Sequence, residues 1–243
     1  MGPSFQKLSG IWAKIYDDKS PDTLNALFCH LHDTKQSISA TNTENLWYKN
    51  AVVYALYVDL FADNFARLTQ ELSYFEDLGV NCLWLLPILE SPMKDQGFDI
   101  SNYYSIRPGL CSGSDGLSEF SAFVQQAHQR GIKIIFDIAI NHTSDQHPWF
   151  LEAKKDETSP KHAFYLWSHN GHEYSKAPVL FSHLCQSNWE KLENSTLKSP
   201  FYFHRFFPHQ PDLNYHTPEV LAEMTKTLAF WAKIGSATCR ESV

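Results

Sequence analysis

The sequence predicts an α/β fold in which parallel strands alternate with helices. From residue 51 onward, apolar runs typical of strands alternate with amphipathic segments typical of helices. The runs NCLWLLPIL and IKIIFDIAI are almost continuously apolar, as expected for strands covered on both faces in a barrel or a doubly wound sheet. Gly79 and Gly131 each stand between a predicted helix and the next predicted strand, where a left-handed residue ends a helix.

The N-terminal elements can be assigned first. Residues 1–45 are predicted to be a helical extension followed by a linker. Ser20-Pro21 is a helix-start signal, and the apolar residues that follow it, up to Leu31, recur at helical spacing. The polar segment 37–45 then has the composition of a linker.

The α/β region is expected to begin near residue 46, and residues 46–142 hold three predicted β/α units. Their elements are a strand at 51–61, a helix at 64–78, a strand at 81–89, a helix at 117–130 and a strand at 133–140.

After the third strand this alternation stops. Residues 143–216 are predicted to be an inserted, irregular segment, because they are rich in aromatic residues, His, Asn and Ser with only short strand-like pieces. Thr217-Pro218-Glu219 predicts a further helix over 217–235. Residues 236–243 lack apolar strand character, so we expect no fourth strand there and an unpaired edge on the third.

Composition and charge exclude some function classes. The formal net charge is −7 and no run of Lys or Arg is present, so a nucleic-acid partner is not expected. No apolar stretch has the length of a membrane span or of a signal-peptide core. Five cysteines without a C-x-x-C pair are consistent with a reducing compartment, so the sequence predicts a cytoplasmic protein.

Three polar clusters follow predicted strands or the insertion: ESPMKDQGFDISNYY, DIAINH and HQPDLNY. Taken alone, Asp99 could cap a turn, Asp137 could be a buried strand acid, and a lone His142 is more often a loop histidine than a functional one. Ligands of parallel α/β proteins gather at the carboxyl ends of strands, however, and all three clusters are predicted at one such end. Their coincidence predicts a binding site.

These clusters resemble conserved regions of the α-amylase superfamily, glycoside hydrolase family 13. DIAINH has the form Asp-x-x-x-Asn-His, and QGFDISNYY is similar to the family's Gly-Tyr-Asp-x-x-x-Tyr segment. QPDLN resembles the fifth region of the oligo-1,6-glucosidase and trehalose synthase branch, and runs such as LWYKNAVVY and HRFFPHQPDLNY look most like trehalose synthase, also called maltose α-D-glucosyltransferase. The resemblance, over about residues 46–235, implies the N-terminal part of a (β/α)8 TIM barrel with an inserted B domain.

The resemblance also implies residue roles. Asp99 would hold the hydroxyls of the sugar at the cleavage subsite, and His142 would donate to the same sugar. Phe98 stands where the family usually has a stacking Tyr, which keeps the ring face and loses the hydroxyl. Asp137 would be a buried orienting acid.

Asn141 and Asp212 match positions that help to hold a structural calcium ion in the family, a role that suits their amide and carboxylate oxygens. No organic cofactor is implied. The expected partners are small α-glucosides such as maltose or trehalose.

Retaining cleavage of an α-glucoside needs a carboxylate nucleophile and a second carboxylic acid roughly 5 Å away. In this family the nucleophile lies in a Gly-Phe-Arg-x-Asp segment expected near Gly235, where the sequence instead has GSATCRESV. No catalytic carboxylate is therefore assigned, and the chain is expected to be a truncated, inactive form of a hydrolase or glucosyltransferase. Two alternatives remain: a non-catalytic sugar-binding remnant, and a half-barrel that pairs with a separately encoded C-terminal half.

Two other classes are disfavoured. A nucleotide-binding α/β domain would carry G-x-G-x-x-G or G-x-x-x-x-G-K-[ST], and neither occurs. A zinc hydrolase of the H-E-x-x-H type is likewise unsupported, because that motif is missing among the 12 histidines.

Overall fold

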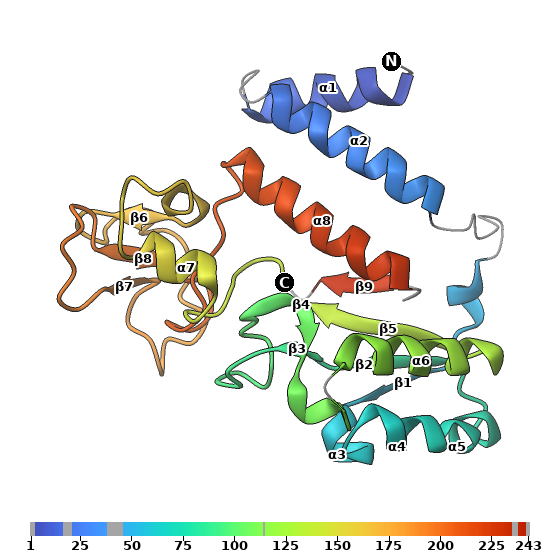
Figure 1. Ribbon diagram of the computed structural model, residues 1–243. Helices are drawn as coiled ribbons and strands as arrows, with labels where there is room; N and C mark the ends of the chain where they lie inside the picture. Colours follow the sequence, from blue (N-terminus) through green and yellow to red (C-terminus); the bar gives the residue numbers. More distant parts are fainter. Residues whose placement is uncertain (1–2, 17–20, 38–45, 114, 235–237, 242–243) are drawn as a thin grey trace.

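The main sheet has four parallel strands, and it carries the site discussed below at its carboxyl edge (Figure 1). The computed structural model describes residues 3–16, 21–37, 46–113, 115–234 and 238–241. The strands of this sheet, in spatial order, are β1 (Val53–Leu56), β2 (Cys82–Leu85), β5 (Lys133–Ile138) and β9 (Thr238–Glu241). The central strands β2 and β5 are almost wholly buried, as their continuous apolar runs predict.

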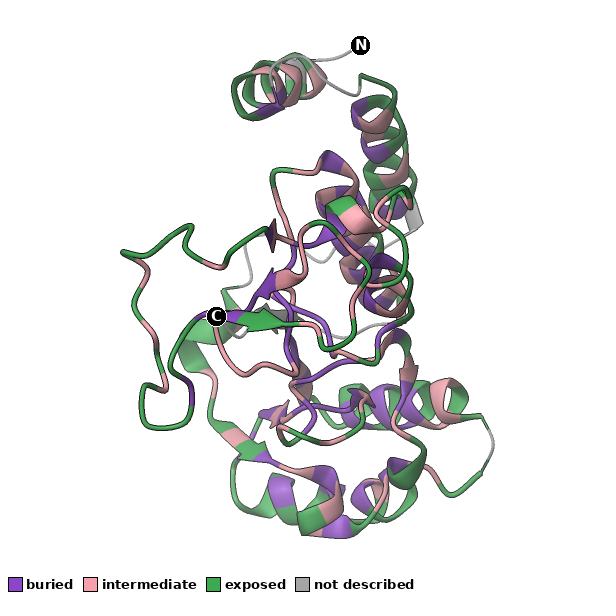
Figure 2. Cartoon of the chain, turned by 90° about the vertical axis from the view of Figure 1, so that its left-hand side faces the viewer, coloured by how far each residue is buried: buried purple, intermediate pink, exposed green. Residues whose placement is uncertain are grey.

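Helices connect the strands and cover the sheet. The helices that follow β1 are α3 (Val58–Ala62), α4 (Phe65–Gln70) and α5 (Leu72–Asp77); α6 (Gly116–Gln129) precedes β5, and α8 (Pro218–Ile234) precedes β9. Among the described residues there are also three short 3-10 helices, at Trp47–Asn50, Pro108–Leu110 and His162–Phe164. Buried residues concentrate along the strands and on the inward faces of these helices (Figure 2). In the part of the chain described, no helix combines the length and apolar character of a membrane span.

Two N-terminal helices, α1 (Pro3–Tyr16) and α2 (Pro21–Ser37), pack against each other, and α2 lies between α1 and α8 (Figure 1). They have a small core of their own, built from Trp12, Tyr16, Leu24 and Leu27. The Tyr16 hydroxyl donates to the Tyr215 carbonyl at 3.1 Å, which ties the pair to the start of α8. The helix predicted to start at Ser20-Pro21 is confirmed over the residues described, as α2, whereas residues 38–45 of the predicted linker lie outside them.

A hairpin of two antiparallel strands, β3 (Leu89–Glu90) and β4 (Asn102–Ile106), follows β2. It is anchored by Trp231 of α8, whose indole N–H donates to the Tyr103 carbonyl at 2.8 Å. The Tyr103 hydroxyl in turn donates to the carbonyls of Ala139 and His142, both at 2.9 Å. The hairpin is therefore fixed to the end of β5 on one side and to α8 on the other.

The insertion contains helix α7 (Pro148–Ala153) and a small antiparallel sheet in the order β6 (Trp167–Ser168), β8 (Phe201–Phe203), β7 (Trp189–Lys191). Its two ends meet: Thr143 N–H donates to the Pro211 carbonyl at 3.2 Å, and Leu213 N–H to the Asn141 carbonyl at 2.8 Å. The insertion thus leaves and re-enters the α/β region at one place.

Two predicted strands are shorter than expected. The run over 51–61 forms β1 only at Val53–Leu56 and then turns into α3, because an apolar run of that length is compatible with a strand or a buried helix. The run over 81–89 ends as β2 at Leu85, two residues before Pro87, which has no N–H for a sheet hydrogen bond.

The expectation for the C-terminal residues is wrong. Within 236–243, residues Thr238–Glu241 form β9, which pairs in parallel with β5 from Ile135↔Thr238 to Ile138↔Glu241. The described sheet therefore has a fourth strand, and β5 has a partner strand on each of its two edges. The prediction relied on apolar side chains, whereas strand pairing is made by backbone groups, which any residue except proline supplies.

Candidate functional site

Three loops meet at the carboxyl edge of the main sheet. These three site loops are residues 91–99 after β2, residues 141–146 after β5, and residues 205–212 at the end of the insertion. An ion pair joins the first two, with Lys94 Nζ 2.8 Å from Asp145 Oδ2. The third is joined to the others by Gln210 Nε2, which donates to Asp95 Oδ2 at 2.7 Å, and by Asp145 N–H, which donates to the His209 carbonyl at 2.9 Å. Polar groups separated by up to 115 positions thus form one structural unit.

Asp99 is fully buried and organises the first site loop. Its Oδ1 accepts hydrogen bonds from Ser91 Oγ at 2.8 Å and from Asp95 N–H at 3.1 Å, and its Oδ2 accepts one from Lys94 N–H at 3.0 Å. A carboxylate has about four acceptor positions, so three donors leave it capacity for one more. The carboxylate is held in one orientation by its own loop.

Gly97 makes the tight path of this loop possible. Its φ is +95°, a region that residues with a Cβ rarely adopt. A Cβ built at this position would lie 2.9 Å from the Cβ of Pro87, which is closer than real Cβ contacts. Because Gly97 has no Cβ, the backbone of this loop can lie directly against Pro87, two residues after β2.

His142 connects the second site loop to the first. Its Nε2 lies 3.1 Å from the Phe98 carbonyl oxygen, and since a carbonyl only accepts, Nε2 carries the proton. Burial lowers the pKa of His142 to about 4, while the hydrogen bond to Phe98 and the charge of Asp99 act in the opposite direction. The ring is a neutral donor at physiological pH. The Phe98 side chain beside it is half-buried.

Asp137 lies near the end of β5 and is almost completely buried. Its Oδ2 accepts a hydrogen bond from the Trp84 indole of the neighbouring strand at 3.1 Å. Tyr57, which follows β1, faces the same carboxylate: burial raises the pKa of its hydroxyl, and the charges of Asp95 and Asp137 raise it further. Asp137 thus shares the carboxyl edge of the sheet with the site loops.

Asn141 and Asp212, the predicted calcium ligands, are brought into contact. The Asn141 side chain is hydrogen-bonded to Asp212, and Arg205 N–H donates to Asp212 Oδ1 at 2.8 Å. Burial raises the pKa of Asp212 to about 7, while the hydrogen bonds from Arg205 and Asn141 and the charge of Arg205 act in the opposite direction.

The donor types at this position fit calcium, although calcium takes six to eight oxygens. The described residues contain no group of three or more His, Cys, Asp or Glu able to hold a metal. Backbone carbonyls and water would have to complete a site built on these two side chains.

His209 also lies in this region, although the sequence did not predict it as a site residue. Its ring stacks on Phe207 with centroids 5.3 Å apart. Burial lowers the pKa of His209, while the nearby Asp99 raises it and Lys94 lowers it. Within the described residues, its Nε2 is buried and has no hydrogen-bond partner. The sequence signal that was available was its position in HQPDLNY, directly before a motif already selected.

The sequence of this chain is similar to those of known proteins. The family model described as "Alpha amylase, catalytic domain" matches residues 63–238. Trehalose synthase of Thermus thermophilus is 43% identical over 197 residues, which are 78% of this chain and 19% of that protein. The trehalose synthase/amylase TreS of Mycolicibacterium smegmatis is 40% identical over 200 residues, 79% of this chain and 32% of that protein.

The structural comparison agrees. A mutant of the trehalulose synthase MutB of Pseudomonas mesoacidophila, solved in complex with glucose, superposes with a TM-score of 0.70 at 31% identity over 81% of this chain and 35% of that one. The chain therefore spans about a fifth to a third of the length of these relatives.

Proposed function

Because this chain belongs to the α-amylase family, glycoside hydrolase family 13, we propose that its three site loops form the glucosyl-binding part of an active site for α-glucosides such as maltose or trehalose. The relatives named as trehalose synthases, and the MutB structure with bound glucose, support this substrate class. The observation that carries the proposal is a buried carboxylate, Asp99, held by three hydrogen bonds of its own loop, next to Phe98, whose carbonyl is bound by the buried, neutral His142 of the second site loop.

These residues would bind and orient one glucosyl ring. A sugar hydroxyl needs an acceptor at a fixed position, and the remaining acceptor capacity of Asp99 meets that need. The one N–H of neutral His142 donates to the Phe98 carbonyl, so His142 would exchange that partner for a sugar hydroxyl when the sugar binds. The half-buried Phe98 ring would cover an apolar face of the sugar. Asp137 would act through Trp84, by holding the end of β5 in place.

Bond cleavage by this family requires two further carboxylates. The printed sequence contains no Gly-Phe-Arg-x-Asp segment, so we expect the purified 243-residue chain to bind maltose without converting it to trehalose or glucose. Trehalose or glucose formed by this chain alone, measured by chromatography, contradicts that expectation. Turnover only after mixing with a second chain that supplies two such carboxylates would favour the half-barrel alternative.

Hydrolysis and glucosyl transfer differ in how well water is kept from the intermediate. We propose transfer, the maltose-trehalose interconversion, because the relatives at 40–43% identity bear that name. Hydrolysis is the alternative, since one of them is also named an amylase.

Asp99→Asn tests the binding role directly. The substitution removes the charge that strengthens each hydrogen bond to Asp99, so maltose binding to the 243-residue chain should weaken at least tenfold by isothermal titration calorimetry. Asp77→Asn, at an exposed position of α5, is the matched control and should bind as the unchanged chain does. Ser91→Ala removes one loop hydrogen bond and leaves the carboxylate, so it separates loss of loop order from loss of the sugar contact.

Equal affinity of Asp99→Asn and the unchanged chain, with both folded by circular dichroism, contradicts the proposed site.

We also propose that Asn141 and Asp212 contribute to a structural calcium site. Millimolar calcium should then raise the melting temperature of the chain, and the increase should grow as pH rises through about 7, where Asp212 ionises. Asp212→Asn should abolish the increase, whereas Asp156→Asn, at an exposed position, should leave it unchanged. The same increase in Asp212→Asn as in the unchanged chain excludes this site.

A further inference from the structure

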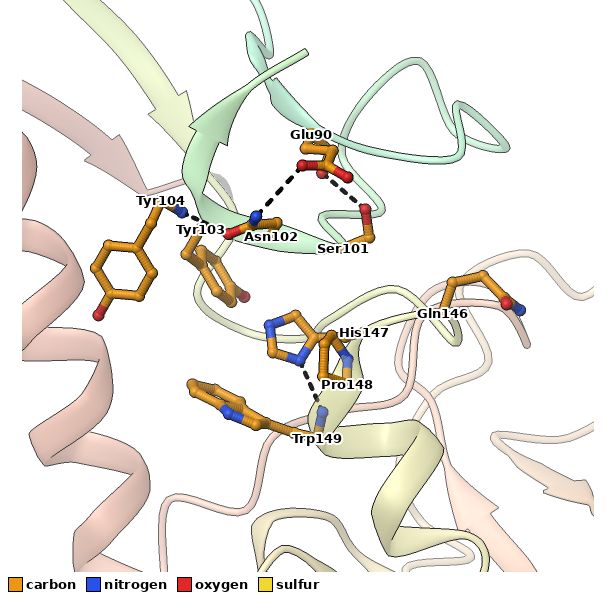
Figure 3. A pocket seen from close by; sticks show the side chains of 9 residues that line it. All are labelled: Glu90, Ser101, Asn102, Tyr103, Tyr104, Gln146, His147, Pro148 and Trp149. Atoms are coloured by element: carbon orange, nitrogen blue, oxygen red, sulfur yellow. Dashed lines mark hydrogen bonds between the residues drawn. The ribbon is translucent and has the colours of Figure 1, made fainter. Parts of the chain in front are cut away.

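A pocket of about 540 Å³ lies between the β3–β4 hairpin and the start of α7 (Figure 3). Its volume falls in the range of roughly 300–1,000 Å³ that is usual for small-molecule sites. The lining residues used in the argument are Glu90, Asn102, Tyr104, Gln146, His147 and Trp149. Phe98, Asp99, Asp137 and His142 are not among the residues that line it, so the pocket does not use the side chains assigned to the glucosyl ring. Gln146 of the second site loop does line it, so the pocket adjoins that loop.

His147 gives the pocket a fixed hydrogen-bond donor. Its Nδ1 accepts from Trp149 N–H at 3.1 Å, so the proton of the neutral ring is on Nε2. Figure 3 shows that second nitrogen turned toward Tyr103 and Asn102, on the pocket side. Burial lowers the pKa of His147 to about 3, so the ring donates without carrying a charge.

The other polar groups supply both donors and acceptors. Asn102 Nδ2 donates to Glu90 Oε2 at 3.3 Å, which orients a carboxylate that lines the pocket and can accept further hydrogen bonds. Gln146 also lines the pocket, but its amide is directed away from the other lining side chains (Figure 3) and its Nε2 donates to Asp145 Oδ1 at 3.1 Å. A ligand that matches these groups must itself be rich in both donors and acceptors.

Aromatic rings border the same space. Tyr104 is 38% exposed, and Trp149 is half-buried. The Trp149 ring centroid lies 5.0 Å from Lys161 Nζ and 5.1 Å from the Phe164 ring centroid. Rings held in this way offer flat apolar surface to a ligand.

The charge of the lining narrows the ligand class. Glu90 is the one ionised side chain among the nine residues that line the pocket, and none of them is a Lys or Arg. A phosphate or carboxylate ligand would meet a negative charge without a compensating cation. Flat apolar faces surrounded by hydroxyl groups that both donate and accept are the properties of a neutral sugar.

We propose that this pocket is a second sugar-binding site, which holds one glucosyl unit of an α-glucan outside the proposed glucosyl site. The proposal rests on the proposed function only for the choice of glucose as the sugar. Both sites are built from the same two stretches of chain: the glucosyl site uses Asp99 and His142, and the pocket uses Glu90 to Tyr104 and Gln146 to Trp149.

Titration of the 243-residue chain with maltotriose, by isothermal titration calorimetry, tests this proposal. We expect two binding sites in the unchanged chain and one in Asp99→Asn. Tyr104→Ala, which removes an exposed ring, and Glu90→Gln, which keeps the Asn102 contact, should each weaken the site that remains in Asp99→Asn at least tenfold. Tyr74→Ala is the matched control, because Tyr74, on α5, is exposed to a similar extent, 45% against 38% for Tyr104, and lies outside the pocket.

Two results overturn the second site: no maltotriose binding in Asp99→Asn, or residual binding that Tyr104→Ala and Glu90→Gln leave unchanged. Displacement of the bound sugar by inorganic phosphate also overturns it, because it indicates an anion site. Failure of the proposed function looks different, since Asp99→Asn would then leave the full binding isotherm unaltered.

Discussion

Replacing Trp231 by alanine is expected to lower the free energy of unfolding by about 3–5 kcal/mol, the usual cost of removing a buried aromatic side chain. Trp231 is fully buried in α8 and packs edge-on against Phe120 and Phe136, at centroid distances of 5.8 and 5.3 Å. Its indole also donates to the Tyr103 carbonyl, so the substitution leaves that carbonyl of the β3–β4 hairpin without its donor. Urea unfolding followed by far-ultraviolet circular dichroism measures the loss.

Trp231→Phe separates the two contributions. It keeps most of the packing and removes the hydrogen bond, so its cost should be about 1–3 kcal/mol. Because the hairpin begins directly before the first site loop, both variants should also weaken maltose binding while folded. A loss below about 1 kcal/mol for Trp231→Ala contradicts the anchoring role assigned to α8.

His147→Asn is expected to make the chain less sensitive to acid. The folded-state pKa of His147 is lowered to about 3, whereas an exposed histidine titrates near 6.5, so the unfolded chain binds a proton that the folded chain does not. The sign follows from this difference: the stabilisation is present above about pH 6.5 and is lost as pH falls toward 3. At pH 5 this residue alone should cost about 2 kcal/mol relative to pH 7.5.

Asparagine keeps the role of His147 as the N-cap of α7, because its side-chain oxygen can accept from Trp149 N–H, and it does not titrate. The free energy of unfolding of both chains is measured with urea at pH 7.5 and at pH 5. Between these pH values the unchanged chain should lose about 2 kcal/mol more than His147→Asn does. His172→Asn, at an exposed position, is the control. Equal pH dependence in His147→Asn and the unchanged chain excludes His147 as a source of acid sensitivity.

Much of the central fold could be predicted because buried parallel strands have a distinctive composition. The apolar runs around Leu83 and Phe136 correspond to β2 and β5, each with neighbours on both edges. Strand ends were predicted less well, since they depend on the backbone: Pro87 ends one run early. β9 was missed because its pairing with β5 uses backbone groups that its side-chain pattern does not indicate.

The site was predictable where one short motif carries it. Asp99 and His142 lie in motifs that follow strands, and both reach the carboxyl edge of the sheet. Contacts between distant loops were not predictable, because nothing in the chain near Asp145 or Gln210 indicates that their partners are in residues 91–99. Such pairs exist only after the strands have set the positions of the loops.

The meeting of the two ends of the insertion has a consequence for how this fold can diverge. Thr143 and Leu213 bring the chain back to within hydrogen-bond distance of where it left, so the intervening residues close a loop on a framework that already exists. The entropy of closing a loop grows only with the logarithm of its length, at about 0.6 kcal/mol for each doubling. The insertion can therefore lengthen, shorten or be exchanged at small thermodynamic cost, and substrate preference can evolve in it while the sheet beneath stays constant.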